Sequence, residues 1–79
     1  MLIEVRVQAK KEVLDPQGEA IRRVLAGLGY REVERVRVGK LMLIEVEDGD
    51  PAVVRSRVEA AAREVLSNPV IEDFEVRMP

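Results

Sequence analysis

Hydrophobic and polar residues alternate along residues 2–10, and a second alternating run closes the sequence. The apolar members of the first run are Ile3, Val5, Val7 and Ala9. Those of the second run are Phe74, Val76 and Met78. Successive side chains of a strand point to opposite faces of a sheet, so each run predicts a strand with one buried face.

Two further segments repeat apolar residues at helical spacing and begin with the same dipeptide. The first segment begins at Asp15-Pro16 and the second at Asp50-Pro51. An aspartate accepts hydrogen bonds from the free N–H groups at a helix start, and proline is tolerated as the first helical residue. We therefore expect Asp15 and Asp50 to be structural caps, followed by Pro16 and Pro51. The apolar stripe of the first helix is Ala20, Ile21, Val24, Leu25 and Leu28.

The segment between the two helices, residues 31–47, predicts two strands separated by Gly39-Lys40. The glycine is expected at a tight turn or bulge, where unusual dihedral angles are needed. The resulting order is strand-helix-strand-strand-helix-strand. That order predicts an α+β fold, a ferredoxin-like plait in which two helices cover one face of a four-stranded antiparallel sheet. Residues 1–79 are expected to form a single domain.

Three leucines fall on the opposite, uncovered face of this predicted sheet. If the alternation continues through Gly39-Lys40, then Leu41 and Leu43 point to that face together with Leu2. Apolar residues on a bare sheet face of a small domain favour a protein contact. A thin core also favours self-association. We therefore predict a homo-oligomer, a dimer or tetramer, with Leu2, Arg37, Lys40, Leu41 and Leu43 as candidate interface residues.

The amino-acid composition excludes most catalytic and metal-binding sites. The 79 residues carry a net charge of −2 and include no cysteine and no histidine. The usual zinc and copper ligands and the usual base for a serine nucleophile are therefore missing. Neither a signal peptide nor a membrane helix is expected, and a cytoplasmic location fits the absence of cysteine. The near balance of charge and the 3% aromatic content disfavour nucleic-acid binding.

Two short segments resemble phosphate-binding motifs, but each lacks residues that the motif requires. Gly39-Lys40-Leu41 lacks the hydroxyl residue and the upstream glycine of a P-loop. QGEAIR, residues 17–22, resembles the Q-G-x-x-x-R segment of acylphosphatases, which share the plait. The orienting asparagine of that family has no counterpart on a central strand here, and Asp15 would repel an anion.

Three segments together resemble the PurS family, the small subunits of phosphoribosylformylglycinamidine synthase. They are VLDPQGEAIRRVLAGLGY at 13–30, VERVRVGKLMLIEVE at 33–47 and NPVIEDFEVRM at 68–78. The segments span nearly the whole chain, and a helix that starts at LDPQG and ends at LGY is the most specific of them.

The resemblance implies a non-catalytic subunit in purine biosynthesis. Its expected partners are a glutaminase subunit and an ATP-dependent large synthetase subunit, between which it supports ammonia transfer. ATP and magnesium would be used by the large subunit, so no cofactor and no catalytic residue are expected in this chain. Two alternatives stay open: a stand-alone regulatory or ligand-binding plait, and an acylphosphatase-like hydrolase.

Overall fold

The computed structural model describes residues 1–79 as three strands and two helices that alternate along the chain. The order is β1 (Leu2–Ala9), α1 (Pro16–Gly27), β2 (Gly39–Glu45), α2 (Pro51–Ala61) and β3 (Glu72–Arg77), with a π-helical turn, η1 (Ala62–Leu66), after α2. The predicted α+β, ferredoxin-like class is confirmed. No helix combines the length and apolar character needed to cross a membrane.

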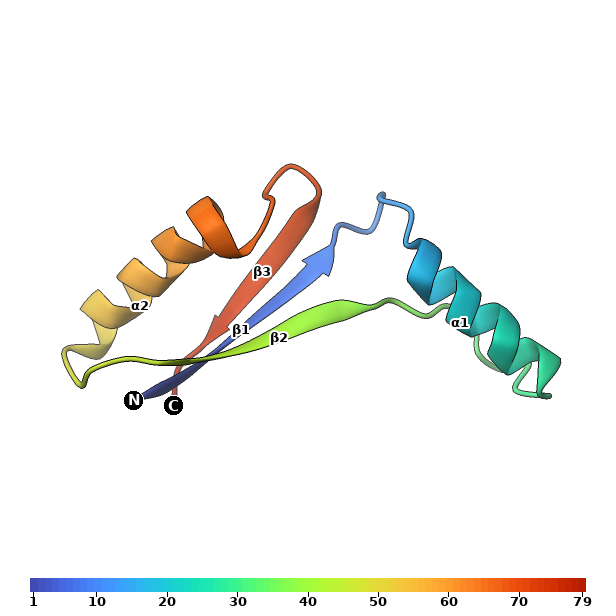
Figure 1. The fold of residues 1–79 in the computed structure, drawn as a ribbon, viewed down its shortest axis with the longest axis horizontal. Helices are drawn as coiled ribbons and strands as arrows, with labels where there is room; N and C mark the ends of the chain where they lie inside the picture. The colour runs from blue at the N-terminus through green and yellow to red at the C-terminus, as the bar shows by residue number, and fades with distance from the viewer.

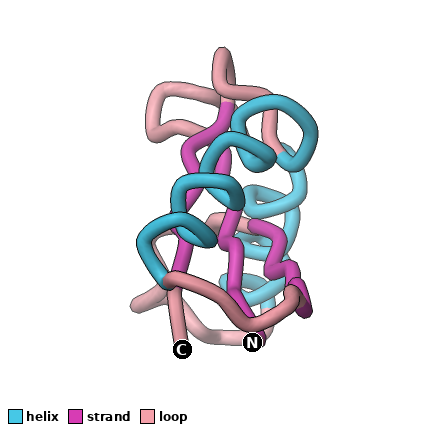
Figure 2. The backbone as a smooth tube through the Cα atoms, turned by 90° about the vertical axis from the view of Figure 1, so that its left-hand side faces the viewer, coloured by secondary structure: helices cyan, strands magenta, loops and turns pink.

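The sheet is antiparallel, with β1 in the centre and strand order β2-β1-β3. Val5 lies opposite Met42 on β2 and Val76 on β3, which places the predicted apolar positions on one face. The two termini lie side by side at one end of the sheet (Figure 2), where the N-terminal ammonium group donates to the carbonyl of Val46 at 2.6 Å.

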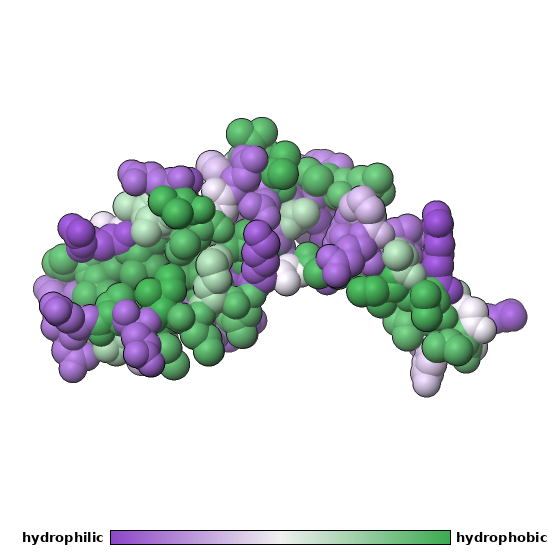
Figure 3. Space-filling model, viewed as in Figure 1, coloured by the Kyte–Doolittle hydropathy of each residue, from purple (hydrophilic) through white to green (hydrophobic).

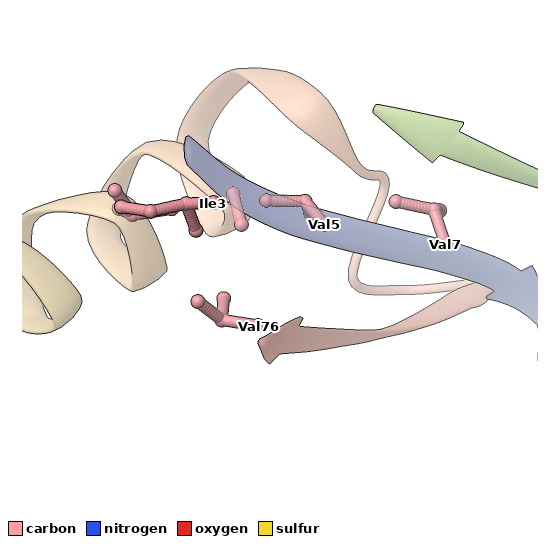
Figure 4. Close-up of a cluster of buried hydrophobic side chains, with 6 residues drawn as sticks. Ile3, Val5, Val7 and Val76 are labelled. Carbon is pink, nitrogen blue, oxygen red and sulfur yellow. The ribbon is translucent and has the colours of Figure 1, made fainter. Parts of the chain in front are cut away.

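The hydrophobic core lies between this face and α2 with η1. Its six buried residues are Ile3, Val5, Val7, Val58, Ala62 and Val76. Figure 4 shows Ile3, Val5 and Val7 in a row along β1, with Val76 on the neighbouring strand β3. Ser67 ends the helical segment, because its amide and hydroxyl groups both donate to the carbonyl of Ala62, at 2.9 and 2.8 Å. This core is small for a chain of this length.

The prediction of four strands is wrong at residues 31–38, which form no strand in this chain. Gly39 and Lys40 are not a turn either; they are the first residues of β2 and pair with Gln8 and Val7. Gly39 has no positive φ. A Cβ atom there would lie 2.7 Å from the carbonyl oxygen of Val7. Close approach between strands, and not an unusual dihedral angle, therefore explains the glycine.

Helix α1 lies beyond the end of the sheet, whereas α2 packs on it (Figure 1). Neither the core nor the partly buried residues around it include a residue of α1. The chain is therefore elongated, 49 × 24 × 14 Å. The expected cover of one sheet face by both helices is found for α2 alone within this chain.

Candidate assembly surfaces

Several hydroxyl and carboxyl groups of this chain take part in internal hydrogen bonds. Ser67 donates its hydroxyl to a backbone carbonyl, and no cluster of metal-ligating residues occurs along residues 1–79. The pKa of Glu19 is lowered by its hydrogen bonds from Arg22, and the pKa of Glu75 by those from Arg77. These shifts hold the carboxylates charged at neutral pH, so neither is poised to exchange a proton there.

In the segment that resembles acylphosphatases, the groups that could bind an anion already donate hydrogen bonds to carboxylates of the chain. Arg22 donates to both oxygens of Glu19, at 2.9 and 2.6 Å. The amide of Gly18, which would face an anion at the helix start, donates instead to Asp15 Oδ1 at 2.9 Å. An anion entering here would have to displace two carboxylates, so the geometry disfavours a phosphate site.

Asp15 fastens α1 to the chain that leads into β2. It is the N-cap of the helix, with Pro16 as the first helical residue, and its Oδ2 also accepts a bond from the amide of Val38 at 2.7 Å. Gly18 packs against the carbonyl of Val36, and an added Cβ would lie only 2.1 Å from that oxygen. The start of α1 and residues 36–38 therefore form one unit, here called the α1 clamp.

The second cap is simpler. Asp50 Oδ1 accepts a bond from the amide of Ala52 at 2.9 Å, and Pro51 is the first residue of α2. Two amides bind Asp15, whereas one binds Asp50. The Gly18 amide chiefly, and then the Val38 amide, hold the pKa of Asp15 below its ordinary value.

The five candidate interface residues separate into three environments. Leu2, Leu41 and Leu43 lie on the sheet face opposite α2 and are 47%, 57% and 60% exposed. Arg6 lies opposite Leu41 on this face, and Glu4 lies opposite Leu43. The leucines thus form an apolar strip, flanked by charged side chains. We name this surface the outer face.

Lys40 and Arg37 do not belong to the outer face. Lys40 pairs with Val7, on the face that carries α2. Arg37 donates to the carbonyls of Ala9 and Lys10, at 2.5 and 2.7 Å, and Arg35 donates to that of Lys11 at 2.9 Å. The arginines thereby attach the connector after β1 to the α1 clamp and are not a free basic stripe.

The sequence pattern did not reveal that the apolar stripe of α1 would be uncovered. Ile21, Val24 and Leu28 are 39%, 62% and 71% exposed. In the space-filling view, hydrophobic surface covers α1 on one side of a deep notch and covers the α2 region on the other side (Figure 3). The loop after β2 and helix α2 line a groove of about 540 Å³, to which they contribute Val46 and Val53.

Comparison with known proteins gives one consistent family. The model of the PurS family, described as phosphoribosylformylglycinamidine (FGAM) synthase, matches residues 2–79. The PurS subunit of Bacillus subtilis is 39% identical over 72 residues, which cover 91% of this chain and 84% of that protein. The PurS subunit of Methanocaldococcus jannaschii is 36% identical over 74 residues, which cover 94% and 89%.

Solved structures agree with this result. The crystal structure of Methanocaldococcus jannaschii PurS superimposes with a TM-score of 0.86 at 36% identity and covers 96% of this chain and 92% of its own. A chain in the structure of PurLQS from Thermotoga maritima gives a TM-score of 0.83 at 38% identity, with coverages of 98% and 96%.

Proposed function

The chain belongs to the PurS family of subunits of phosphoribosylformylglycinamidine synthase, an activity of purine biosynthesis, and we propose that it is the non-catalytic assembly subunit of that enzyme. Its partners are then the glutaminase subunit and the ATP-dependent large subunit, as the PurLQS structure of Thermotoga maritima suggests. The large subunit uses ATP and magnesium, and this chain carries no cofactor. The complex works in the cytoplasm.

This proposal rests on one contrast: the chain lacks the usual catalytic residues, yet it exposes apolar surface. The chain has no histidine or cysteine, and its paired carboxylates serve as caps and ion-pair partners. At the same time it exposes leucines on the outer face and an uncovered stripe on α1. Exposed apolar surface of this kind marks protein contacts. A chain with these properties contributes contacts, while its partners contribute the reacting groups.

Ammonia transfer gives a physical reason for such a subunit. Ammonia released into water is diluted and largely protonated at neutral pH, and protonation removes the lone pair that attacks the activated substrate. Holding the glutaminase and synthetase sites together keeps the local concentration of ammonia high, which is a proximity effect. We assign this chain the role of holding the two partners in that geometry.

Self-association is part of the same proposal. The core contains six buried residues. A domain of this size buries a smaller fraction of its surface than a larger domain does, and oligomerisation is a common remedy. The open edges of the sheet, the outer face and the stripe of α1 are the surfaces available, so we propose a dimer or a tetramer.

Reconstitution with alternative nitrogen sources tests the function. The two partner subunits are assayed for amidine synthesis with and without this chain, first with glutamine and then with a high concentration of ammonium chloride. Glutamine-driven synthesis is expected to fall sharply without the chain, while ammonia-driven synthesis persists. Equal glutamine-driven rates in the two mixtures would refute the assembly role.

A further inference from the structure

The loop between β2 and α2 contains an exposed aspartate followed by a glycine, Asp48-Gly49. Both residues lie outside every helix and strand, and the side chain of Asp48 is 92% exposed. Asp48 Oδ1 accepts one hydrogen bond, from the N-terminal ammonium group at 3.0 Å. Ion pairs of such exposed groups contribute little stability, so the carboxyl group is held only weakly in place.

The main chain that follows Asp48 is equally unrestrained. The amide of Gly49 donates to no backbone carbonyl of the chain, whereas the N–H groups inside helices and strands are held by such bonds. Glycine has no Cβ, so its backbone rotates more freely and its nitrogen is less shielded than that of any other residue. The Gly49 nitrogen can therefore approach Cγ of the adjacent Asp48.

No other aspartate or asparagine of the chain has this combination. Asp15, Asp50 and Asn68 each precede a proline, whose nitrogen carries no hydrogen to lose. Asp73 precedes Phe74 within β3, where antiparallel pairing with β1 fixes the main chain. The chain thus offers one position at which an exposed side-chain carboxyl group lies next to an unbonded amide.

We propose that Asp48-Gly49 is a site of spontaneous modification, at which the folded chain converts aspartate to isoaspartate through a succinimide ring. The Gly49 nitrogen attacks Cγ of the neutral carboxyl group, so a C–N bond forms and a carboxyl C–O bond breaks. The departing hydroxyl group leaves as water together with the amide hydrogen. Water then opens the ring. Opening at the original main-chain carbonyl gives isoaspartate, and opening at the new C–N bond restores aspartate.

The modification changes the connection between the sheet and α2. In isoaspartate the main chain runs through Cβ and Cγ of residue 48, so it gains one carbon atom, and the former main-chain carboxyl group becomes the free carboxylate. The charge is conserved, but its position relative to the N-terminal ammonium group changes. The added atom lies just before the Asp50 cap of α2, the helix that contributes Val58 to the core.

Ageing of the purified protein tests the proposal directly. The folded protein is incubated at physiological temperature and pH, and isoaspartate is then labelled with an isoaspartyl-specific methyltransferase and radioactive S-adenosylmethionine. Trypsin cleaves after Lys40 and Arg55 and releases residues 41–55, the peptide that contains Asp48-Gly49. The label should grow with incubation time and lie in this peptide alone. A peptide 41–55 that stays unlabelled would overturn the proposal.

Two variants test the chemistry without removing a core residue. Asp48→Glu keeps the charge but requires a larger ring, which closes more slowly. Gly49→Ala adds a Cβ that shields the nitrogen and lies 3.7 Å from Val54 Cγ2, an ordinary contact, so folding should persist by circular dichroism. Both variants should lose most of the label, and Asp73→Glu, the matched control, should keep it. Labelling of Asp48→Glu or Gly49→Ala at the wild-type rate would contradict the proposed reaction.

Comparison with the unfolded chain separates the structure of the loop from its sequence. Wild-type protein is aged in guanidinium chloride, desalted and labelled in the same way. The folded protein should gain label at a rate comparable to that of the unfolded chain, because the loop leaves both residues unrestrained. A folded protein that stays unlabelled, beside an unfolded chain that gains label, would overturn the site.

Discussion

Replacing Gly18 by alanine should destabilise the protein, although the same change favours most helices. A glycine-to-alanine change within a helix ordinarily stabilises by about 0.5–1 kcal/mol. At Gly18 the new Cβ would lie 2.1 Å from the carbonyl oxygen of Val36 and 2.9 Å from Asp15 Oδ2. The oxygen of Val36 belongs to the backbone, so it cannot rotate away, and the α1 clamp must open.

The expected magnitude follows from these opposing terms. Overpacking of this kind costs about 1–3 kcal/mol, and subtracting the helix gain leaves a net loss of up to about 2.5 kcal/mol. Gly27→Ala in the same helix is the matched control, because nothing lies within 4 Å of its added Cβ. That variant should be more stable than wild type by up to about 1 kcal/mol.

Urea unfolding followed by far-ultraviolet circular dichroism, at one protein concentration for all variants, measures the contrast. The midpoint should move to lower urea for Gly18→Ala and to slightly higher urea for Gly27→Ala. If Gly18→Ala matched or exceeded the stability of Gly27→Ala, the close contact between α1 and Val36 would not exist in solution.

The remaining predictions concern the outer face and the caps. Burying one leucine side chain is worth about 1.5–3 kcal/mol, so Leu41→Asp with Leu43→Asp should lower the mass of the assembly in sedimentation velocity; an unchanged mass would exclude the outer face from the interface. Asp50→Ala should cost about 0.5–2 kcal/mol in urea unfolding without reducing amidine synthesis by the assembled complex, whereas loss of synthesis at unchanged stability would contradict a purely structural cap. Because the pKa of Asp15 is lowered in the folded state, its stabilisation is present above its unfolded pKa of about 3.9 and is lost as the pH falls toward the folded value. Between pH 5 and 2 the unfolding midpoint of wild type should therefore fall more steeply than that of Asp15→Ala, and parallel profiles would contradict the linkage.

The elements that depend on local pattern could be predicted from the sequence. The alternation of Ile3, Val5 and Val7 predicted a strand whose apolar side is buried, and Met42 and Ile44 of β2 keep the same parity, because they lie opposite Val5 and Ile3. The Asp-Pro pairs marked both helix starts, because capping and proline geometry involve neighbours in the chain. The exposed leucines of the outer face followed from the same parity.

The absence of a strand at residues 31–38 could not be predicted in this way. Val36 and Val38 alternate with Arg35 and Arg37 whether or not this segment pairs with β2, so periodicity does not distinguish the two. One signal was available: Gly39-Lys40 is not one of the dipeptides, such as Asn-Gly, that favour a two-residue hairpin. The stripe of α1 is likewise apolar whether or not it covers a sheet. The bonds from Arg37 to backbone carbonyls join segments distant in sequence, and no local pattern indicates them.

Co-sedimentation of the three subunits tests the central claim most directly. The glutaminase and large subunits are mixed with glutamine and ATP, and their sedimentation is compared with and without this chain. If the chain is the assembly subunit, the two partners should sediment as one complex in its presence and separately in its absence. Co-sedimentation to the same extent without the chain would contradict the account.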